Sequence, residues 1–155
     1  MALFPPTKGH GRQGVYGHKG KGFTIHKIVD KRRFPLGIRV TGANEAEVLQ
    51  IIPMLKEIKP PQHSVLEADK GSDSDKLRAK LSWYLKMGSL IPKRQFPGQP
   101  EPPKLVNTNR WKVEQSHAHR HLSCRRTVVC YEKSLLSFTA FIFLAYSLIA
   151  MNMLI

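Results

Sequence analysis

The sequence predicts an α/β fold in a single domain, residues 1–155, and three patterns in succession predict it. Residues 23–29 and 35–40 are two strand-like runs joined by a short polar turn, as in an antiparallel hairpin. Residues 44–58 follow with apolar side chains at helical spacing. A third strand, a turn and a second helical pattern occupy residues 65–85. Strands and helices in this order are typical of a sheet flanked by helices.

The first helical pattern carries its own start and stop signals. Asn44 is the expected N-cap, with Glu47 three residues later, and Pro60 is expected to end the helix. The apolar positions are Val48, Ile51, Ile52, Leu55 and Ile58. Pro53 lies among them and predicts a kink. Asp30, in the preceding hairpin turn, is predicted to have no catalytic role.

Asp69 follows the short apolar strand Val65 to Ala68, at the end of a strand where α/β proteins place their sites. Local pattern alone favours a simple turn residue, and the site interpretation stays open beside it. Asp73 or Ser74 is expected to cap the next helix. Its predicted apolar face consists of Leu77, Leu81, Tyr84 and Leu85, and Gly88 is its expected stop. Residues 89–92 fit a last short strand.

Three other stretches have distinctive compositions. Residues 5–22 form a basic, glycine-rich loop that lacks the Gly-Lys-Ser/Thr ending of a phosphate-binding P-loop. Residues 95–107 contain four prolines and are predicted to be a linker. Residues 134–155 are apolar and uncharged, so that they fit either a buried helix or a membrane span. The start of the chain shows no signal peptide, because prolines interrupt it at once.

The net charge of +14 indicates a polyanionic partner. Lys and Arg exceed acidic residues by eight in residues 1–40 and by seven in residues 81–133, whereas residues 41–80 sum to −1. Two basic segments therefore favour nucleic acid as the partner. Only two cysteines are present, which indicates a reducing compartment. His117 and His121 lie one helical turn apart, but no second ligand pair completes a zinc site.

Several stretches together resemble bacterial insertion-sequence transposases with an RNase H-like DDE domain. The sequence Ala-Asp-Lys-Gly-x-Asp-Ser of residues 68–74 is similar to the second catalytic motif of that family. Residues 18–44 resemble the segment before this motif, and residues 110–132 resemble the segment that carries the third carboxylate. The matching stretches follow the family's order along nearly the whole chain.

The resemblance implies an RNase H-like mixed sheet flanked by helices and a two-metal site for Mg²⁺ or Mn²⁺. It implies that Asp69 and Glu114 are the second and third catalytic, metal-binding carboxylates, with Glu114 on the inward face of a helix. From pattern alone, Glu114 is a surface residue paired with Lys112 or Arg110. The residues expected to hold DNA phosphates are Lys19, Lys21, Lys70, Arg110, Lys112, Arg125 and Arg126.

The chain also departs from the family pattern. Met1 occupies the place where the family has its first catalytic aspartate, and the central first strand of the sheet lies upstream of that place. Ser72 replaces the usual aromatic residue after the motif's glycine, and Asn107 and His121 stand where the family has Tyr and Lys. We therefore expect an incomplete sheet and a chain that is inactive alone, either a decayed copy or the downstream frame of a frameshifted product.

The expected function is transposition of an insertion sequence in the bacterial cytoplasm, at the nucleoid. The expected partners are DNA, the upstream part of the transposase and, in an active form, further copies of the chain. The alternative is a non-catalytic basic protein anchored in a membrane by residues 134–155. We favour a buried C-terminal helix, because serine and threonine side chains moderate its hydropathy and because the family ends in such a helix.

Overall fold

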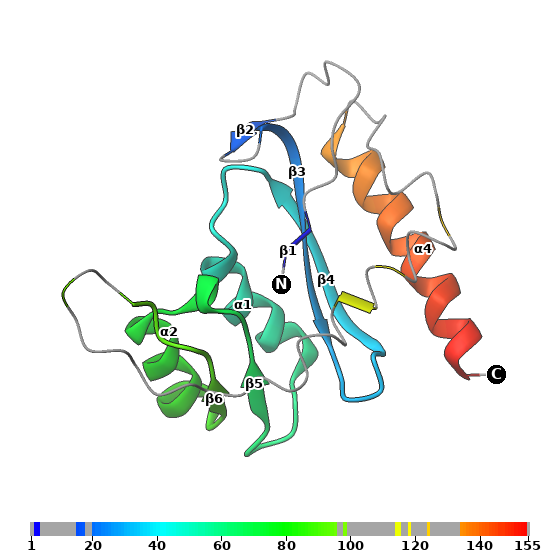
Figure 1. The fold of residues 1–155 in the computed structure, drawn as a ribbon. Coiled ribbons are helices and arrows are strands. Elements are labelled where there is room, and N and C mark those ends of the chain that lie inside the picture. Colours follow the sequence, from blue (N-terminus) through cyan, green and yellow to red (C-terminus); the bar gives the residue numbers. More distant parts are fainter. Residues whose placement is uncertain are drawn as a thin grey trace.

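The structure is a computed structural model that describes residues 2–3, 15–17, 20–95, 98, 114–115, 118, 124 and 134–154. Figure 1 shows a mixed arrangement of strands and helices, with α1 and α4 on opposite sides of a long hairpin. The strands are β1 (Ala2–Leu3), β2 (Val15–Gly17), β3 (Gly20–Val29), β4 (Pro35–Gly42), β5 (Val65–Glu67) and β6 (Gly88–Leu90). The helices are α1 (Glu47–Ile58), η1 (Lys70–Ser72), α2 (Asp75–Ala79), η2 (Lys80–Tyr84) and α4 (Leu135–Leu154).

The predicted hairpin is confirmed as the antiparallel pair β3 and β4, which runs from Phe23 opposite Gly42 to Val29 opposite Pro35. Its turn is fixed by Asp30, whose Oδ1 accepts hydrogen bonds of 2.8 Å from the backbone N–H groups of Arg32 and Phe34. A side chain that bonds its own backbone in this way is typical of turns. The prediction that Asp30 is a turn residue is therefore confirmed.

Two short strands that the sequence analysis did not predict also pair with β3. β2 pairs with the first residues of β3, with Tyr16 opposite Lys21, inside the glycine-rich stretch that was expected to be a loop. β1 pairs further along, with Ala2 opposite His26 and Leu3 opposite Ile25. Glycine lowers the tendency to form strands without forbidding backbone pairing, so a hairpin neighbour is enough to order β2.

α4 covers one face of the hairpin. Phe23 and Ile25, on that face of β3, form a core with buried side chains of the helix, and the rings of Phe23 and Phe138 stack at 5.6 Å between centroids. The helix contributes Phe138, Ile142, Tyr146 and Ile149 to this cluster. Because side chains of a strand alternate between faces, Lys27 points the same way, and its Nζ lies 5.1 Å from the centroid of the Tyr146 ring.

α4 is also long and apolar enough to cross a membrane, judged by length and composition alone. Its packing is one-sided, because Ile142 is 0% exposed whereas Leu144 is 59% exposed. The structure therefore supports a helix that packs against the sheet, and the membrane-anchored alternative is not favoured.

α1 differs from its prediction at its start, whereas its passage through Pro53 and its end before Pro60 agree with it. It begins at Glu47 after Ala46, and no side chain caps it, so the expected N-cap at Asn44 is wrong. Asn44 instead lies in the turn that leaves β4, where Glu45 N–H bonds the Gly42 carbonyl. The helix also continues through Pro53 to Ile58, and ends with Lys59 in the left-handed region.

The second helical pattern begins as predicted, with the Ser74 side chain accepting from the Leu77 N–H at 3.4 Å. After α2 the chain forms the π-helical turn η2. A π turn spaces its hydrogen bonds by five residues instead of four, which changes the direction of the side chains that follow. Tyr84, predicted on the apolar face, is consequently 69% exposed, with Lys56 Nζ 4.8 Å above its ring.

The predicted last strand, Ser89 to Pro92, is observed as β6, which begins one residue earlier and ends two residues earlier. It pairs with β5 in parallel. These two strands form a sheet separate from the hairpin sheet. A second hydrophobic core joins the two sheets to α1. Leu55 of α1 packs in one cluster with Leu81 and Ile91. Ile28 of β3 and Leu66 of β5 lie against that cluster.

His26 lies in the α1-facing side of the hairpin and is 3% exposed. Burial lowers the pKa of its imidazole to about 4, because the charged form loses its hydration. Its Nε2 lies 2.8 Å from the Thr41 hydroxyl, so that the neutral ring keeps a hydrogen bond inside the protein.

We predict that Ile142→Ala lowers the stability of the chain by about 2–5 kcal/mol, because it removes a fully buried side chain and leaves a cavity. Leu144→Ala, on the exposed face of the same helix, is the matched control and should change it by no more than about 0.5 kcal/mol. Urea unfolding of both variants measures the difference. Equal effects would contradict the one-sided packing of α4.

Candidate active site around Asp69

β5 delivers Asp69 to the start of a tight 3₁₀ turn. The Asp69 carboxylate caps this turn, because its Oδ1 accepts from the Lys70 N–H at 2.7 Å. The turn closes when the Ser72 N–H donates to the Asp69 carbonyl at 2.8 Å. Asp69 therefore has both its backbone and its side chain fixed locally, at the end of a parallel strand.

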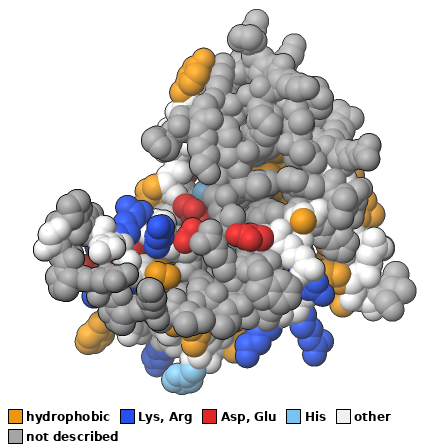
Figure 2. Space-filling model, viewed as in Figure 1, with side chains coloured by type: hydrophobic (Ala, Val, Ile, Leu, Met, Phe, Trp, Pro, Cys, Tyr) orange, Lys and Arg blue, Asp and Glu red, His pale blue; other side chains and the backbone are white. Residues whose placement is uncertain are grey.

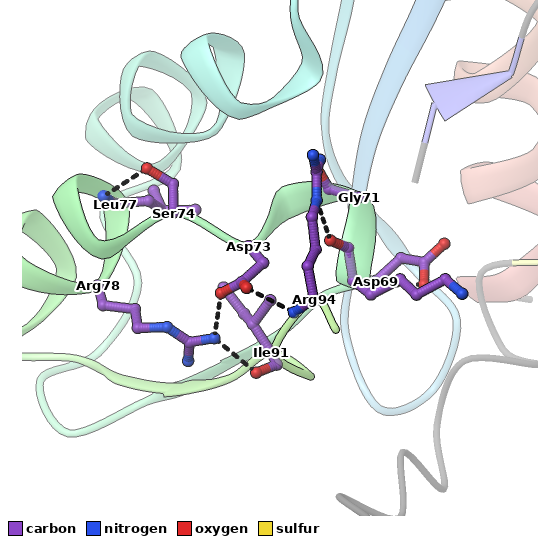
Figure 3. Close-up of polar contacts among 9 residues, drawn as sticks. Asp69, Gly71, Asp73, Ser74, Leu77, Arg78, Ile91 and Arg94 are labelled. Atoms are coloured by element: carbon purple, nitrogen blue, oxygen red, sulfur yellow. Dashed lines mark hydrogen bonds and ion pairs between the residues drawn. The ribbon is translucent and has the colours of Figure 1, made fainter. Parts of the chain in front are cut away.

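A second carboxylate, Asp73, ties this turn to two other parts of the chain (Figure 3). Arg78 Nη2 donates to Asp73 Oδ1 at 2.6 Å and to the Ile91 carbonyl at 2.8 Å. The Arg94 backbone N–H donates to Asp73 Oδ2 at 2.7 Å. Both oxygens of Asp73 thus accept charge-assisted or backbone hydrogen bonds, which are stronger than bonds between neutral side chains.

The guanidinium of Arg94 completes the attachment. Its Nε donates to the Lys70 carbonyl at 3.0 Å, and its Nη2 donates to the Gly71 carbonyl at 2.6 Å. One arginine side chain therefore holds the turn that follows Asp69, and its backbone holds Asp73. We call Asp73, Arg78 and Arg94 the Asp73 clamp.

The clamp keeps Asp73 ionised. Burial opposes its charge, but hydrogen bonds from the Arg94 backbone and the Arg78 side chain, with the positive charges of Arg78 and Lys93, outweigh that effect. The pKa of Asp73 consequently lies below its ordinary value. A permanently charged Asp73 is suited to bind the arginines rather than to exchange protons.

Asp69 does not join the clamp. In Figure 3 its carboxylate points away from Asp73. It lies instead on the wall of a cavity of about 690 Å³, together with His26 and Ile28 of β3 and Glu47 of α1. Figure 2 shows Asp and Glu side chains near the middle of the face in view, with Lys and Arg side chains beside them. The site thus has the Asp69 carboxylate at a cavity, with the exposed Lys70 next to it in the chain.

The structure locates only some of the residues that the sequence predicted for the site. Lys70 is exposed next to Asp69, and Lys21 lies in β3 opposite Tyr16. Glu114 is an exposed helical residue, as are Gln115 and Ala118, so the expected inward face is not observed at these three positions. The other predicted phosphate contacts lie outside the described residues: Lys19, Arg110, Lys112, Arg125 and Arg126.

Metal binding at Asp69 and Glu114 remains a prediction. Within the described ranges, no group of three or more His, Cys, Asp or Glu side chains is placed to hold a metal ion. Asp69 itself offers a carboxylate, the ligand type that Mg²⁺ prefers, at an accessible wall.

Comparison with known proteins identifies the family. Residues 4–153 match the family model described as the transposase DDE domain. The chain belongs to this family. A curated relative, the putative transposase for insertion sequence element IS402 of Burkholderia cepacia, is 30% identical over 136 residues, which cover 82% of this chain. No solved structure matches the chain.

The DDE domain described here spans 62% of the length of that relative. The family in general uses divalent metal ions and acts on DNA. The predicted resemblance to an insertion-sequence transposase with a DDE domain is confirmed.

Sequence reasoning missed the clamp. It assigned Asp73 only as a candidate helix cap, and gave Arg78 and Arg94 no role. The spacing of five residues between Asp73 and Arg78 is not one of the pairings that place side chains together on a regular α-helix, and Arg94 is 21 residues from Asp73. Only the folded turn brings the three together in the DDE domain.

We predict that Asp73→Ala destabilises the chain by about 1–3 kcal/mol, because two arginine donors lose their acceptor. Asp75→Ala is the matched control, since Asp75 is exposed in the first turn of α2 and contributes mainly to the helix dipole. Thermal unfolding of both variants, followed by circular dichroism, compares them. A larger loss for Asp75→Ala would refute the clamp.

Proposed function

We propose that this chain is the part of an insertion-sequence transposase that carries two of the three metal-binding carboxylates, Asp69 and Glu114. In this proposal it acts on phosphodiester bonds of DNA at the ends of the element and at its target. The observation that carries the proposal is Asp69, held at the end of a parallel strand and on a cavity wall, in a stretch that the family model matches.

The proposal includes an RNase H-like sheet that is incomplete at its centre. The described chain contains, in order, the antiparallel hairpin of β3 and β4, the helix α1, the strand β5, the helix α2 and the strand β6, which is parallel to β5. This order supports the arrangement. The sheet is divided between the hairpin and the β5–β6 pair. β1, of two residues, pairs with β3 at Ile25 and His26, and His26 lines the cavity beside β5.

The chemistry requires hard cations, which when bound supply an activated water or hydroxyl and neutralise the charge on the leaving oxygen. Asp69 has the donor type for such a cation. The role of the chain's own residues is to bind and orient: Asp69 and Glu114 would hold the cations, and Lys70 would contact a neighbouring phosphate. The Asp73 clamp would keep Asp69 in position by fixing the turn that begins with its carbonyl.

Two carboxylates are too few for the reaction. Two divalent cations about 4 Å apart repel each other strongly unless several anionic ligands surround them. Asp30 does not replace the missing first ligand, because its Oδ1, its backbone N–H and its carbonyl all make hydrogen bonds within the β3–β4 turn. We therefore propose that the chain alone does not cleave DNA, and that it functions in the bacterial cytoplasm with the upstream part of the transposase, as a homo-oligomer.

We predict that nicking of the element's ends, dependent on Mg²⁺ or Mn²⁺, appears when the upstream coding segment is fused to the chain with Met1→Asp. Asp69→Asn or Glu114→Gln in this fusion should abolish nicking, because each removes a ligand charge, whereas Asp75→Asn should retain it. Gel analysis of a supercoiled plasmid bearing the ends measures the activity. Nicking by the unmodified chain that disappears with Asp69→Asn would show that the first ligand lies elsewhere.

We predict that the chain binds duplex DNA without sequence preference, and that its affinity falls steeply with salt, because binding releases counterions from the phosphates. Lys19→Gln combined with Lys21→Gln should lower the slope of log affinity against log salt by about 2, since each phosphate contact contributes about 0.9.

The matched control for DNA binding is Lys59→Gln with Lys76→Gln, which removes the same charge from two exposed positions outside both basic segments. Fluorescence anisotropy at several salt concentrations compares the two double variants. An equal loss in both would show that total charge, and not the predicted segment, determines binding.

A further inference from the structure

Two aromatic side chains that follow one another in the chain are exposed at the end of the second helical segment. Trp83 is 87% exposed, and Tyr84 is exposed beside it. Neither ring belongs to the two hydrophobic cores of the described residues. Tryptophan is on average a highly buried residue, because its large ring gains much from leaving water. An exposed pair of aromatic rings therefore indicates a surface that contacts a partner.

The π turn η2 brings the two rings to the same side. Leu81 is buried and marks the inward face of this helical segment. On a regular α-helix Tyr84, three residues after Leu81, would lie beside that face. In η2 the Leu85 N–H instead bonds the Lys80 carbonyl, which turns Tyr84 outward next to Trp83. π turns are rare and occur frequently at functional sites.

Lysine side chains accompany the two rings. Lys56 of α1 has its Nζ 4.8 Å from the centroid of the Tyr84 ring. Lys80 and Lys86 are exposed in the same segment as the rings, and residues 80–86 contain no acidic side chain. Glu57, which follows Lys56, is ion-paired with an arginine of β4. The surface is therefore both aromatic and cationic. We call the following residues the Trp83 surface: Lys56, Lys80, Trp83, Tyr84 and Lys86.

The Trp83 surface is separate from the candidate active site. Two residues after Lys86, β6 begins with Gly88 opposite Val65, the first residue of β5. Asp69 follows the other end of β5. Figure 1 shows α2, which leads into η2, on the side of β5 away from the long hairpin. No residue of the Trp83 surface lines the cavity on whose wall Asp69 lies.

We propose that the Trp83 surface binds single-stranded DNA. Trp83 stacks on an unpaired base, and the three lysines contact neighbouring phosphates. This ligand is polyanionic and presents flat aromatic faces, which are the two properties that the surface complements. Duplex DNA carries the same kind of charge, but its bases are hidden in the stack. An acidic protein segment would match the lysines without a need for exposed rings.

The choice of DNA over RNA rests on the proposed function, since the matched family acts on DNA. Binding at the Trp83 surface requires no divalent metal ion, so the tests use the full chain in the presence of EDTA. Strand cleavage does require metal ions. The binding proposal and the proposed function can therefore fail separately.

The first test measures the affinity of the chain for a short labelled oligothymidine by fluorescence anisotropy. Trp83→Ala should lower this affinity by about fivefold to a hundredfold, because base–aromatic stacking is lost. The affinity for a duplex of the same length should not change. Trp83→Phe should retain most of the affinity, since a smaller ring still stacks. Leu144→Ala truncates an exposed side chain of α4, on the other side of the hairpin, and is the control without effect.

Three results would overturn the proposal. The first is an unchanged affinity of Trp83→Ala for oligothymidine, or an equal loss for single-stranded and duplex DNA. The second is tighter binding of oligouridine than of oligothymidine, which would assign the surface to RNA. The third is a dimer that Trp83→Ala dissociates in sedimentation experiments while oligothymidine binding stays the same, which would assign the surface to a contact between copies.

The lysines are tested by the salt dependence of binding. Lys80→Gln combined with Lys86→Gln should lower the slope of log affinity for oligothymidine against log salt by about 1.4, since each phosphate contact on a single strand contributes about 0.7. An unchanged slope would contradict the phosphate contacts.

Tryptophan fluorescence tests the stacking directly. The chain has two tryptophans, so that Trp111→Phe leaves Trp83 as the only one. Oligothymidine should quench the emission of this variant, because the stacked base contacts the indole ring. In Trp83→Phe, which retains Trp111, saturating oligothymidine should cause little quenching. Quenching that disappears with Trp111→Phe and persists with Trp83→Phe would overturn the proposal.

Discussion

The packing of α1 against both sheets holds the described part of the chain together. Leu55 is 2% exposed and belongs to the cluster that includes Leu81 and Ile91, while Ile28 packs on the same cluster from the hairpin. At Gly37, β4 approaches α1 so closely that a Cβ atom there would lie 2.6 Å from Ile58 Cδ1. No backbone ladder joins the described sheets, so the position of the β5–β6 pair relative to the long hairpin depends on this packing.

Because the β5–β6 pair is not joined to the long hairpin by a backbone ladder, the turn after Asp69 needs additional hydrogen bonds to hold its position. A sheet of two strands is marginally stable by itself, and β5 and β6 contain three residues each. Backbone pairing alone would therefore leave Asp69 poorly positioned. The clamp compensates by bonding the turn to the segment after β6 through Arg94 and to α2 through Arg78. Asp69 is in this way fixed by charge-assisted hydrogen bonds where the sheet is smallest.

The elements with the strongest periodicity could be predicted from the sequence. The β3–β4 hairpin and α1 follow from alternation and from helical spacing, and the Asp69 strand follows from a short apolar run before a turn. Element ends were less predictable, since α1 begins without the Asn44 cap. Tyr84 was misplaced because nothing in its spacing indicates a π turn.

The C-terminal helix could not be assigned from composition, because its apolar residues occur on every face. Only the contacts of α4 separate the two interpretations, with Phe138 buried on Phe23 and Leu144 exposed. Likewise, β1 contains two residues and has no periodicity to detect. Only its pairing with Ile25 and His26 of β3 reveals it.

The position of Asp69 relative to the long hairpin depends on side-chain packing, because no backbone ladder joins the two described sheets. Asp69 follows β5 in the smaller sheet, whereas the cavity wall opposite it is formed by β3 of the larger one. Functional side chains must be held to within about 0.5 Å, which requires that the elements carrying them do not move relative to each other. In the described chain α1 provides this constraint, since Ile28 of β3 and Leu66 of β5 both pack against the cluster around Leu55. The geometry of the proposed site and the stability of this second core are therefore coupled.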